Sequence, residues 1–123
     1  MKVQYMLYKT TNKAGEKPIR VSISMRGERY ITTVGYSIKE EKWDKAKQQV
    51  KQGVTNAAGA DWRTINSRLT DITTHFTDYD LRTTEKPTID DLKAEFEKAV
   101  NRNKAKVAGA ALGQSEEQIE AAA

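Results

Sequence analysis

The sequence predicts an α+β fold, in which a three-stranded antiparallel β-sheet packs against one or two α-helices. Two observations lead to this prediction. The first third of the chain alternates apolar and polar residues in short runs separated by turn residues, which is typical of antiparallel strands. The second half spaces its apolar residues three and four apart, which is typical of helices. Because three strands cannot bury an apolar face alone, the helices are expected to cover it.

Three consecutive strands are expected between residues 3 and 34. Residues 3–10 are rich in strand-forming side chains, and residues 18–26 alternate strictly between apolar and polar. Gly27 then predicts a tight hairpin turn, and residues 29–34 form the returning strand. The apolar face of the middle strand consists of Ile19, Val21, Ile23 and Met25.

The segment after the third strand predicts a bend and a single helical turn. Gly35 is expected to end the strand, because glycine tolerates bent backbone. Ser37 and Glu40 have the spacing of a capping box, which would start a helical turn. That turn would bring the large ring of Trp43 onto the apolar face of the sheet.

Two helices are expected in the second half. Residues 45–51 lack clear periodicity, and residues 52–60 are small and flexible, which indicates a loop. Asp61 is the expected N-cap of the first helix, and Thr88, after the helix-breaking Pro87, is the expected cap of the second. Their apolar stripes are Ile65, Leu69, Ile72, Phe76 and Tyr79 in the first, and Ile89, Leu92, Phe96 and Val100 in the second.

The chain has little to bury after Asn103. We therefore expect one domain over residues 1–102 and a linker or flexible, disordered tail over residues 103–123. There is no apolar run of about 18 residues to cross a membrane, and the N-terminus is too polar for a signal peptide. Cysteine is absent, so a cytosolic setting is the expectation.

The charge is distributed unevenly. Residues 1–51 contain twelve Lys or Arg and five Asp or Glu, a net charge of +7, whereas residues 52–123 have a net charge of −3. Such asymmetry favours contact between the first half and a polyanion. A basic surface that is merely solvated explains the charge equally well.

Residues suited to catalysis or metal binding do not occur as a set. His75 is the only histidine, and without cysteine it cannot form a typical zinc site, so we expect it to be structural or to face solvent. No nucleophile, base and orienting group can be assigned together, and there is no glycine-rich phosphate loop. We expect no cofactor, no small-molecule substrate and no catalysis by this chain alone.

The polar face of the sheet is the remaining candidate site. A narrow β-ribbon fits the major groove of DNA, where arginine can read guanine and hydroxyl groups can bond phosphates or base edges. The alternative is that this face is simply exposed to solvent, as in many antiparallel sheets. The candidate residues on the face are Arg20, Ser22, Ser24, Arg26, Arg29 and Thr33, and those that would flank it and hold phosphates are Lys9, Lys13, Lys39, Lys42 and Lys45. The direction in which Ile31 points is left open.

Residues 17–44, KPIRVSISMRGERYITTVGYSIKEEKWD, resemble a known family. They look like the N-terminal arm-type DNA-binding domain of Bacteroides-type tyrosine recombinases, the integrases of phages and conjugative transposons. The likeness extends over about residues 1–102, with Val34 where threonine is common and no proline within residues 39–41. The motif positions are Lys17-Pro18-Ile19, Gly27, Thr33-Val34-Gly35, Tyr36-Ser37-Ile38 and Trp43-Asp44, followed by INSRLTDITTHF and TIDDLKAEFEKA.

This resemblance implies a three-stranded sheet that enters the major groove of double-stranded DNA. It also implies a role at arm-type sites, away from the crossover point, in DNA integration and recombination by a mobile element. The recombinase motif His-x-x-Arg is missing, since His75 is followed by Phe-Thr-Asp. We therefore expect a non-catalytic amino-terminal fragment of a tyrosine recombinase in the bacterial cytoplasm, associated with the nucleoid, with other recombinase subunits as further partners. The alternative is a protein-interaction module without direct DNA contact.

Overall fold

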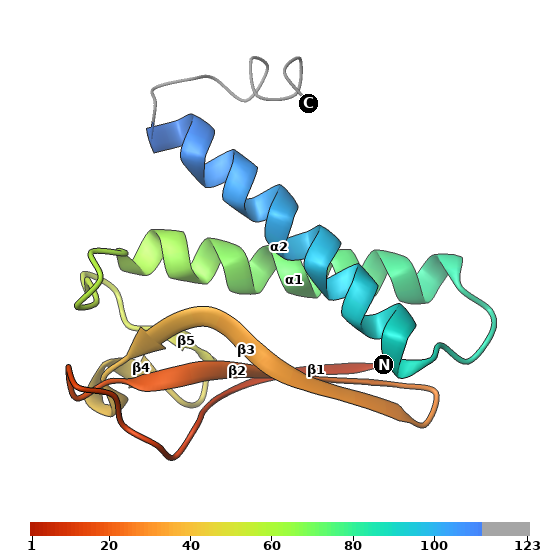
Figure 1. Ribbon diagram of the computed structural model, residues 1–123, viewed down its shortest axis with the longest axis horizontal. Coiled ribbons are helices and arrows are strands. Elements are labelled where there is room, and N and C mark those ends of the chain that lie inside the picture. Colours follow the sequence, from red (N-terminus) through yellow and green to blue (C-terminus); the bar gives the residue numbers. More distant parts are fainter. Residues whose placement is uncertain (112–123) are drawn as a thin grey trace.

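The computed structural model describes residues 1–111 and places two helices on one face of a three-stranded antiparallel sheet (Figure 1). The predicted α+β fold is confirmed. The sheet has the order β1-β2-β3, so each strand lies beside its neighbour in sequence. The strands are β1 (Lys2–Leu7), β2 (Lys17–Met25), β3 (Glu28–Ile38), β4 (Trp43–Asp44) and β5 (Gln49–Val50), and the helices are α1 (Trp62–Arg82) and α2 (Ile89–Ala111).

The predicted hairpin turn joins β2 to β3. Arg26 and Gly27 both have positive φ, 48° and 91°, which is the turn geometry that matches the natural twist of two antiparallel strands. The register that follows places Ser22 of β2 between Gln4 of β1 and Ile31 of β3.

The face of the sheet toward the helices is the core of the molecule. Ile19, Val21, Ile23 and Met25 are all at most 1% exposed, as the alternation in the sequence predicted. Across them lies the apolar stripe of α1, in which Ile65, Leu69, Ile72 and Phe76 are buried and Tyr79 is partly buried.

The third strand does not end at Gly35, contrary to our prediction. β3 continues to Ile38, which is 1% exposed. The register shifts between Pro18 and Arg20 of β2, which indicates a bulge, and Gly35 has a φ of 95°. Glycine therefore allows the strand to bend and continue, because a side chain at this φ would be strained.

The capping box at Ser37 is also wrong. Ser37 belongs to β3, and its carbonyl oxygen accepts a hydrogen bond from the Asn56 side chain at 3.1 Å. A short 3₁₀ helix, Glu40–Lys42, does follow, but its N-cap is Lys39 and has no side-chain hydrogen bond. Trp43 is nevertheless 7% exposed and part of the core, as expected.

Residues 45–51, which show no periodicity, take part in a small hairpin. β4 and β5 pair through Trp43 with Val50 and Asp44 with Gln49. The side-chain oxygen of Gln48 accepts a hydrogen bond from the backbone N–H of Tyr5 at 2.8 Å. The hairpin therefore satisfies part of the open edge of β1.

Both helix starts occur as predicted. The Asp61 carboxylate accepts a hydrogen bond from the Thr64 backbone N–H at 2.8 Å, and this bond lowers the pKa of Asp61. Thr88 and Asp91 cap α2 reciprocally, each accepting a bond from the backbone N–H of the other.

The second helix is longer than predicted. It runs to Ala111, so residues 103–111 are helical where we expected a linker or tail, while residues 112–123 lie outside the described residues. Asn103 is fully buried, and its side chain accepts a bond from Arg68 at 3.1 Å. Ile89, predicted to face the core, is 42% exposed, because the helix buries Leu92, Phe96 and Ala99 instead.

Candidate nucleic-acid interface

One side of the sheet is left uncovered by the helices (Figure 1). We call it the outer face, and its residues follow from the register and the alternation of the strands. The position of Ile31 is thereby settled, since it pairs with Ser22 and is 45% exposed on this face. The outer face consists of Lys2, Gln4 and Met6 from β1, Arg20, Ser22 and Ser24 from β2, and Arg29, Ile31 and Thr33 from β3.

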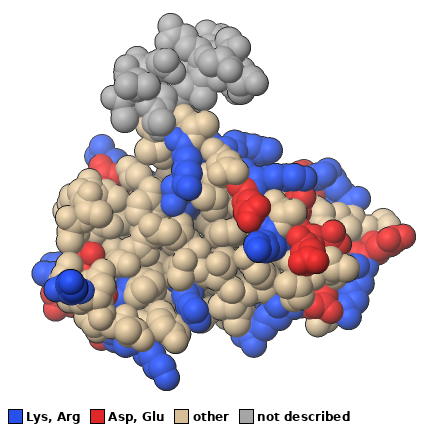
Figure 2. Space-filling model, viewed as in Figure 1, with Lys and Arg blue, Asp and Glu red and all other residues tan. Residues whose placement is uncertain are grey.

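The outer face carries positive charge and no carboxylate. Its charged residues are Lys2, Arg20 and Arg29, with no Asp or Glu among the nine. Lys and Arg side chains project along the lower edge of the molecule in Figure 2, which is the side of the sheet away from the helices. This arrangement favours an anionic ligand.

Arg20 lies on the middle strand of the outer face, between Met6 and Thr33 on the neighbouring strands. Its guanidinium carbon lies 4.1 Å from the centroid of the Tyr8 ring, a cation–π contact. Its Nε is buried without a hydrogen-bond partner, and Arg20 forms no ion pair with any residue in the described part of the chain. Tyr8 therefore restrains a guanidinium whose terminal nitrogens remain available to a ligand.

Ser22 supports the outer face and does not reach solvent. It is 2% exposed, and its hydroxyl accepts a hydrogen bond from Nε of Arg29 at 3.1 Å. We predicted direct DNA contact for Ser22. Because Ser22 is buried, we assign it the role of orienting Arg29 instead. Arg29 itself and Thr33 are exposed, and Ser24 is half-buried.

Arg26 turns away from the outer face. One of its terminal nitrogens lies 3.2 Å from a carboxylate oxygen of Asp80, and the guanidinium also donates to the backbone carbonyls of Asp80 and Glu85. The positive φ in the hairpin turn breaks the alternation that placed Arg26 beside Ser24 in our prediction. Its charge is used to attach the hairpin to the end of α1.

The predicted flanking lysines are all exposed, but they occupy several loops. Lys9 and Lys13 lie between β1 and β2, and Lys39 and Lys42 lie just after β3. These segments are close in space, because Lys39 lines a shallow hollow together with Thr11 and Gly15. Lys45 lies apart, in the turn between β4 and β5.

His75 is buried and structural, which is one of the two roles that we expected for it. It is 8% exposed, and its Nε2 lies 2.9 Å from a carboxylate oxygen of Glu95 across the two helices. Burial alone would raise the pKa of Glu95, but hydrogen bonds from Lys98 and His75 hold it below its ordinary value. Within residues 1–111 no three His, Asp or Glu side chains gather to hold a metal ion.

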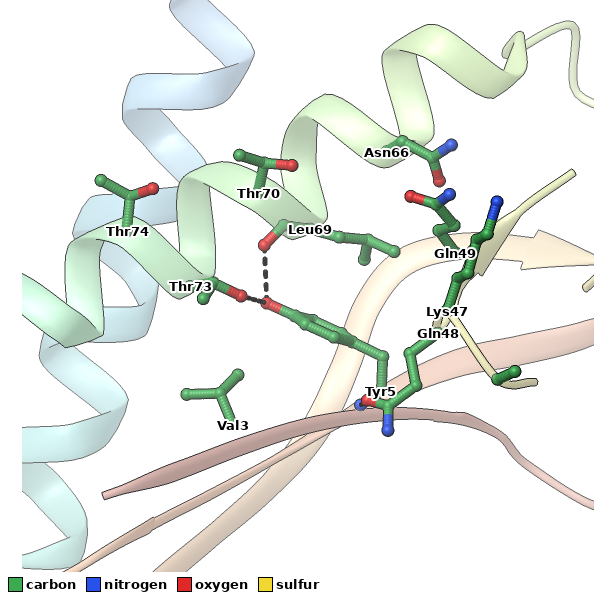
Figure 3. A pocket seen from close by; sticks show the side chains of 11 residues that line it. Val3, Tyr5, Lys47, Gln48, Gln49, Asn66, Leu69, Thr70, Thr73 and Thr74 are labelled. Carbon is green, nitrogen blue, oxygen red and sulfur yellow. Dashed lines mark hydrogen bonds between the residues drawn. The ribbon is translucent and has the colours of Figure 1, made fainter. Parts of the chain in front are cut away.

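A hollow of about 420 Å³ lies between β1, the β4–β5 hairpin and α1 (Figure 3). The Tyr5 hydroxyl points toward its wall, donating to the Leu69 carbonyl at 2.6 Å and lying 2.7 Å from the Thr73 hydroxyl. Burial raises the pKa of Tyr5, so the phenol stays protonated and keeps this donor role. Tyr5 thus fastens the sheet to α1, and the hollow contains no set of groups suited to catalysis.

Sequence reasoning missed Arg68, a buried arginine that holds three elements together. Its Nη1 donates to the Val34 carbonyl at 3.0 Å, its Nε donates to Asn103, and its guanidinium lies 4.3 Å from the centroid of the Tyr36 ring. A polar residue in the Ile65–Leu69 turn of an amphipathic helix was the available signal. Through its contacts with Val34 and Tyr36, Arg68 holds the bend of β3 on both sides of Gly35.

Residues 5–93 match a family described as Arm DNA-binding domain. The chain belongs to this family. The arm DNA-binding domain takes DNA as its partner and is not itself catalytic. No curated protein and no solved structure matches the chain. Among the described residues of this arm domain, no helix is long and apolar enough to span a bilayer.

Proposed function

We propose that this arm domain binds arm-type DNA sites by inserting the outer face of its sheet into the major groove. The observation that supports the proposal is a surface with three cationic residues, no carboxylate and no covering element. The outer strands are separated by roughly 10 Å, two strand spacings. The major groove is about 12 Å wide, so the face has a suitable width.

Most polar residues of the outer face have a chemically defined task in this proposal. Arg20, restrained by Tyr8, pairs in bidentate fashion with a guanine edge, and Arg29, oriented by Ser22, contacts a second base or a phosphate. Thr33 and Ser24 donate hydroxyl hydrogen bonds. The phosphate contacts are assigned to Lys2, Lys9, Lys13, Lys39, Lys42 and Lys45.

The recombinase context is part of the same proposal. The arm domain would belong to a Bacteroides-type tyrosine recombinase that integrates a mobile element such as a conjugative transposon. It would direct that enzyme to sites away from the crossover, while strand cleavage resides in a separate catalytic domain. The place of action would be the nucleoid in the bacterial cytoplasm. Support comes from the family match and from the motifs in residues 17–44.

A binding assay with two arginine variants tests the DNA-binding role. Duplexes enriched from a random pool would be titrated by fluorescence anisotropy with wild-type protein, Arg20→Ala and Arg82→Ala. Arg20→Ala is expected to weaken binding by roughly 5- to 150-fold, because a bidentate contact to a base is worth about 1–3 kcal/mol. Arg82→Ala removes the same charge from an exposed pair with Asp78 on α1, and should leave affinity almost unchanged. Equal affinities for all three proteins would refute the assignment of the outer face.

The salt dependence of binding provides a second measurement. Each phosphate contact contributes about −0.9 to the slope of log K against log salt concentration. Lys39→Ala should therefore reduce the slope by roughly 1 and weaken all sequences alike. An unchanged slope would remove Lys39 from the set of phosphate contacts.

A protein-interaction role is the second candidate, because two large apolar side chains are exposed where the helices meet. Leu81 is 82% exposed and Ile89 is 42% exposed. Exposed apolar side chains of this kind suit contact with a neighbouring recombinase subunit. Replacing Arg20 and Arg29 together with glutamate separates the two functions, since it should abolish DNA binding and leave subunit contacts intact. DNA binding that is unchanged in this variant would contradict the role of the outer face and favour the interaction role.

A further inference from the structure

Two apolar side chains are exposed within the cationic outer face. Met6 is 36% exposed and Ile31 is 45% exposed. Met6 lies directly opposite Arg20 on β1, and Ile31 lies directly opposite Ser22 on β3. The two therefore flank the central strand on opposite sides, one on each edge of the surface.

These positions require an explanation, because solvent contact favours polar side chains there. The inner face already has a complete apolar layer, in which Ile19, Val21 and Ile23 are 0% exposed. The remaining outer positions on the two flanking strands are all polar, namely Lys2, Gln4, Arg29 and Thr33. Met6 and Ile31 thus interrupt an otherwise polar surface without contributing to the core.

In the major groove, one base-pair group is apolar. Thymine presents a methyl group at C5 beside the O4 acceptor, and apolar side chains recognise that methyl by contact. A protein partner would also suit exposed apolar residues, but the surrounding Lys2, Arg20 and Arg29 favour an anionic one. A duplex offers both the charge and the methyl groups.

We propose that Ile31 and Met6 are specificity-determining residues that contact pyrimidine 5-methyl groups in the DNA target. This inference rests on the proposed function and adds to it a chemical preference: the preferred site carries thymines on both sides of the base pair that Arg20 contacts. The contact to Ile31 is on the β3 side and the contact to Met6 on the β1 side. 5-Methylcytosine offers the same methyl group and would be accepted at these positions.

Replacement of thymine by deoxyuridine tests this inference on the wild-type protein. The substitution removes the methyl group alone and leaves every hydrogen-bonding group of the base in place. A duplex enriched by the full chain from a random pool would be prepared with deoxyuridine at one thymine at a time. Binding would be measured by fluorescence anisotropy at one fixed salt concentration. At the contacted thymines we expect affinity to fall about fourfold, the effect of one methyl-sized apolar group.

Variants assign each thymine to a side chain. Ile31→Ala should bind the thymine and deoxyuridine duplexes equally at one position, and Met6→Ala should do so at another. Ile31→Thr keeps a β-branched side chain in the strand and guards against a loss of folding. Leu81→Ala is the matched control, since it truncates an exposed apolar residue of α1 that is not part of the outer face, and it should keep the fourfold ratio at both positions.

The possible results are distinct. Specific binding with no effect of deoxyuridine at any position would overturn the methyl contacts and leave the DNA-binding function standing. Deoxyuridine effects that persist in Ile31→Ala and Met6→Ala would overturn the assignment to these two residues. An absence of binding to any duplex, at low salt as well, would refute the proposed function and this inference with it.

Discussion

The side chain of Arg68 packs directly against the backbone of β3 at Gly35. Gly35→Ala tests how much this close contact contributes to stability. The φ of Gly35 is 95°, and a Cβ there would lie 2.8 Å from Nη1 of Arg68. A left-handed conformation costs a residue with a side chain about 1–2 kcal/mol. Arg68 would also have to leave the Val34 carbonyl, 3.0 Å away, and a hydrogen bond from a charged group is worth about 1.5–3 kcal/mol.

We therefore expect Gly35→Ala to lower the free energy of unfolding by about 2.5–5 kcal/mol, a large part of a typical domain's stability. Urea denaturation followed by tryptophan fluorescence would measure it, since Trp43 is buried in the core. Gly15→Ala is the control: Gly15 has a φ of 79° with no atom within 4 Å of the added Cβ, so only the backbone cost of about 1–2 kcal/mol remains. Equal losses in the two variants would show that the Arg68 contact contributes nothing.

Three further substitutions examine other parts of the molecule. Tyr8→Leu removes the aromatic face under Arg20 and should weaken DNA binding about two- to fivefold, measured by anisotropy, with the circular dichroism spectrum unchanged. Ser22→Ala removes the acceptor for Arg29 and should weaken binding by about threefold, an effect that should disappear in an Arg29→Ala background. Glu95→Gln should destabilise the protein at neutral pH, because the pKa of Glu95 is lowered in the folded state. The stability contributed by the ionised carboxylate is present above the ordinary carboxyl pKa. It is lost as the pH falls through the folded pKa of Glu95. Thermal unfolding at pH 7 and at pH 3 would check this, and an equal difference between Glu95→Gln and wild type at both pH values would contradict it.

The parts of the fold that depend on neighbouring residues could be predicted from the sequence. Residues 18–26 show their buried face through strict alternation, and Asp61 and Thr88 identify helix starts because capping is a contact within one turn. The turn at Gly27 is local in the same sense. These predictions required no knowledge of what lies across the core.

The errors occur where a distant residue decides the local conformation. Gly35 has the chemistry of a strand end, but Arg68 and the register shift between Pro18 and Arg20 make it a bend within a longer strand. The helix continues past Asn103, whose buried side chain bonds Arg68 and Asp71 of the other helix. The β4–β5 hairpin, likewise, is held by the contact between Gln48 and Tyr5.

In the candidate site, too, features fixed by neighbouring residues were predicted and features decided by distant residues were not. Alternation correctly placed Arg20, Arg29 and Thr33 on one surface, since strand periodicity fixes the face of each residue. It could not show that Ser22 is buried beneath a neighbour, nor that Arg26 leaves the surface for Asp80. Both facts depend on how side chains from separate strands and helices share the available space.

The β2–β3 hairpin is joined to α1 and to the loop after it, and these two contacts affect how the surface meets a duplex. Arg26 binds Asp80 on one side of the hairpin, and Glu28 binds Lys86 at 3.1 Å on the other. These contacts restrain the hairpin against the rest of the domain before any ligand arrives. When the protein surface is restrained in this way, the DNA has to change its shape to fit the protein. Base steps that the protein never touches would then influence affinity through their stiffness, and easily deformed sites would bind more tightly than rigid ones.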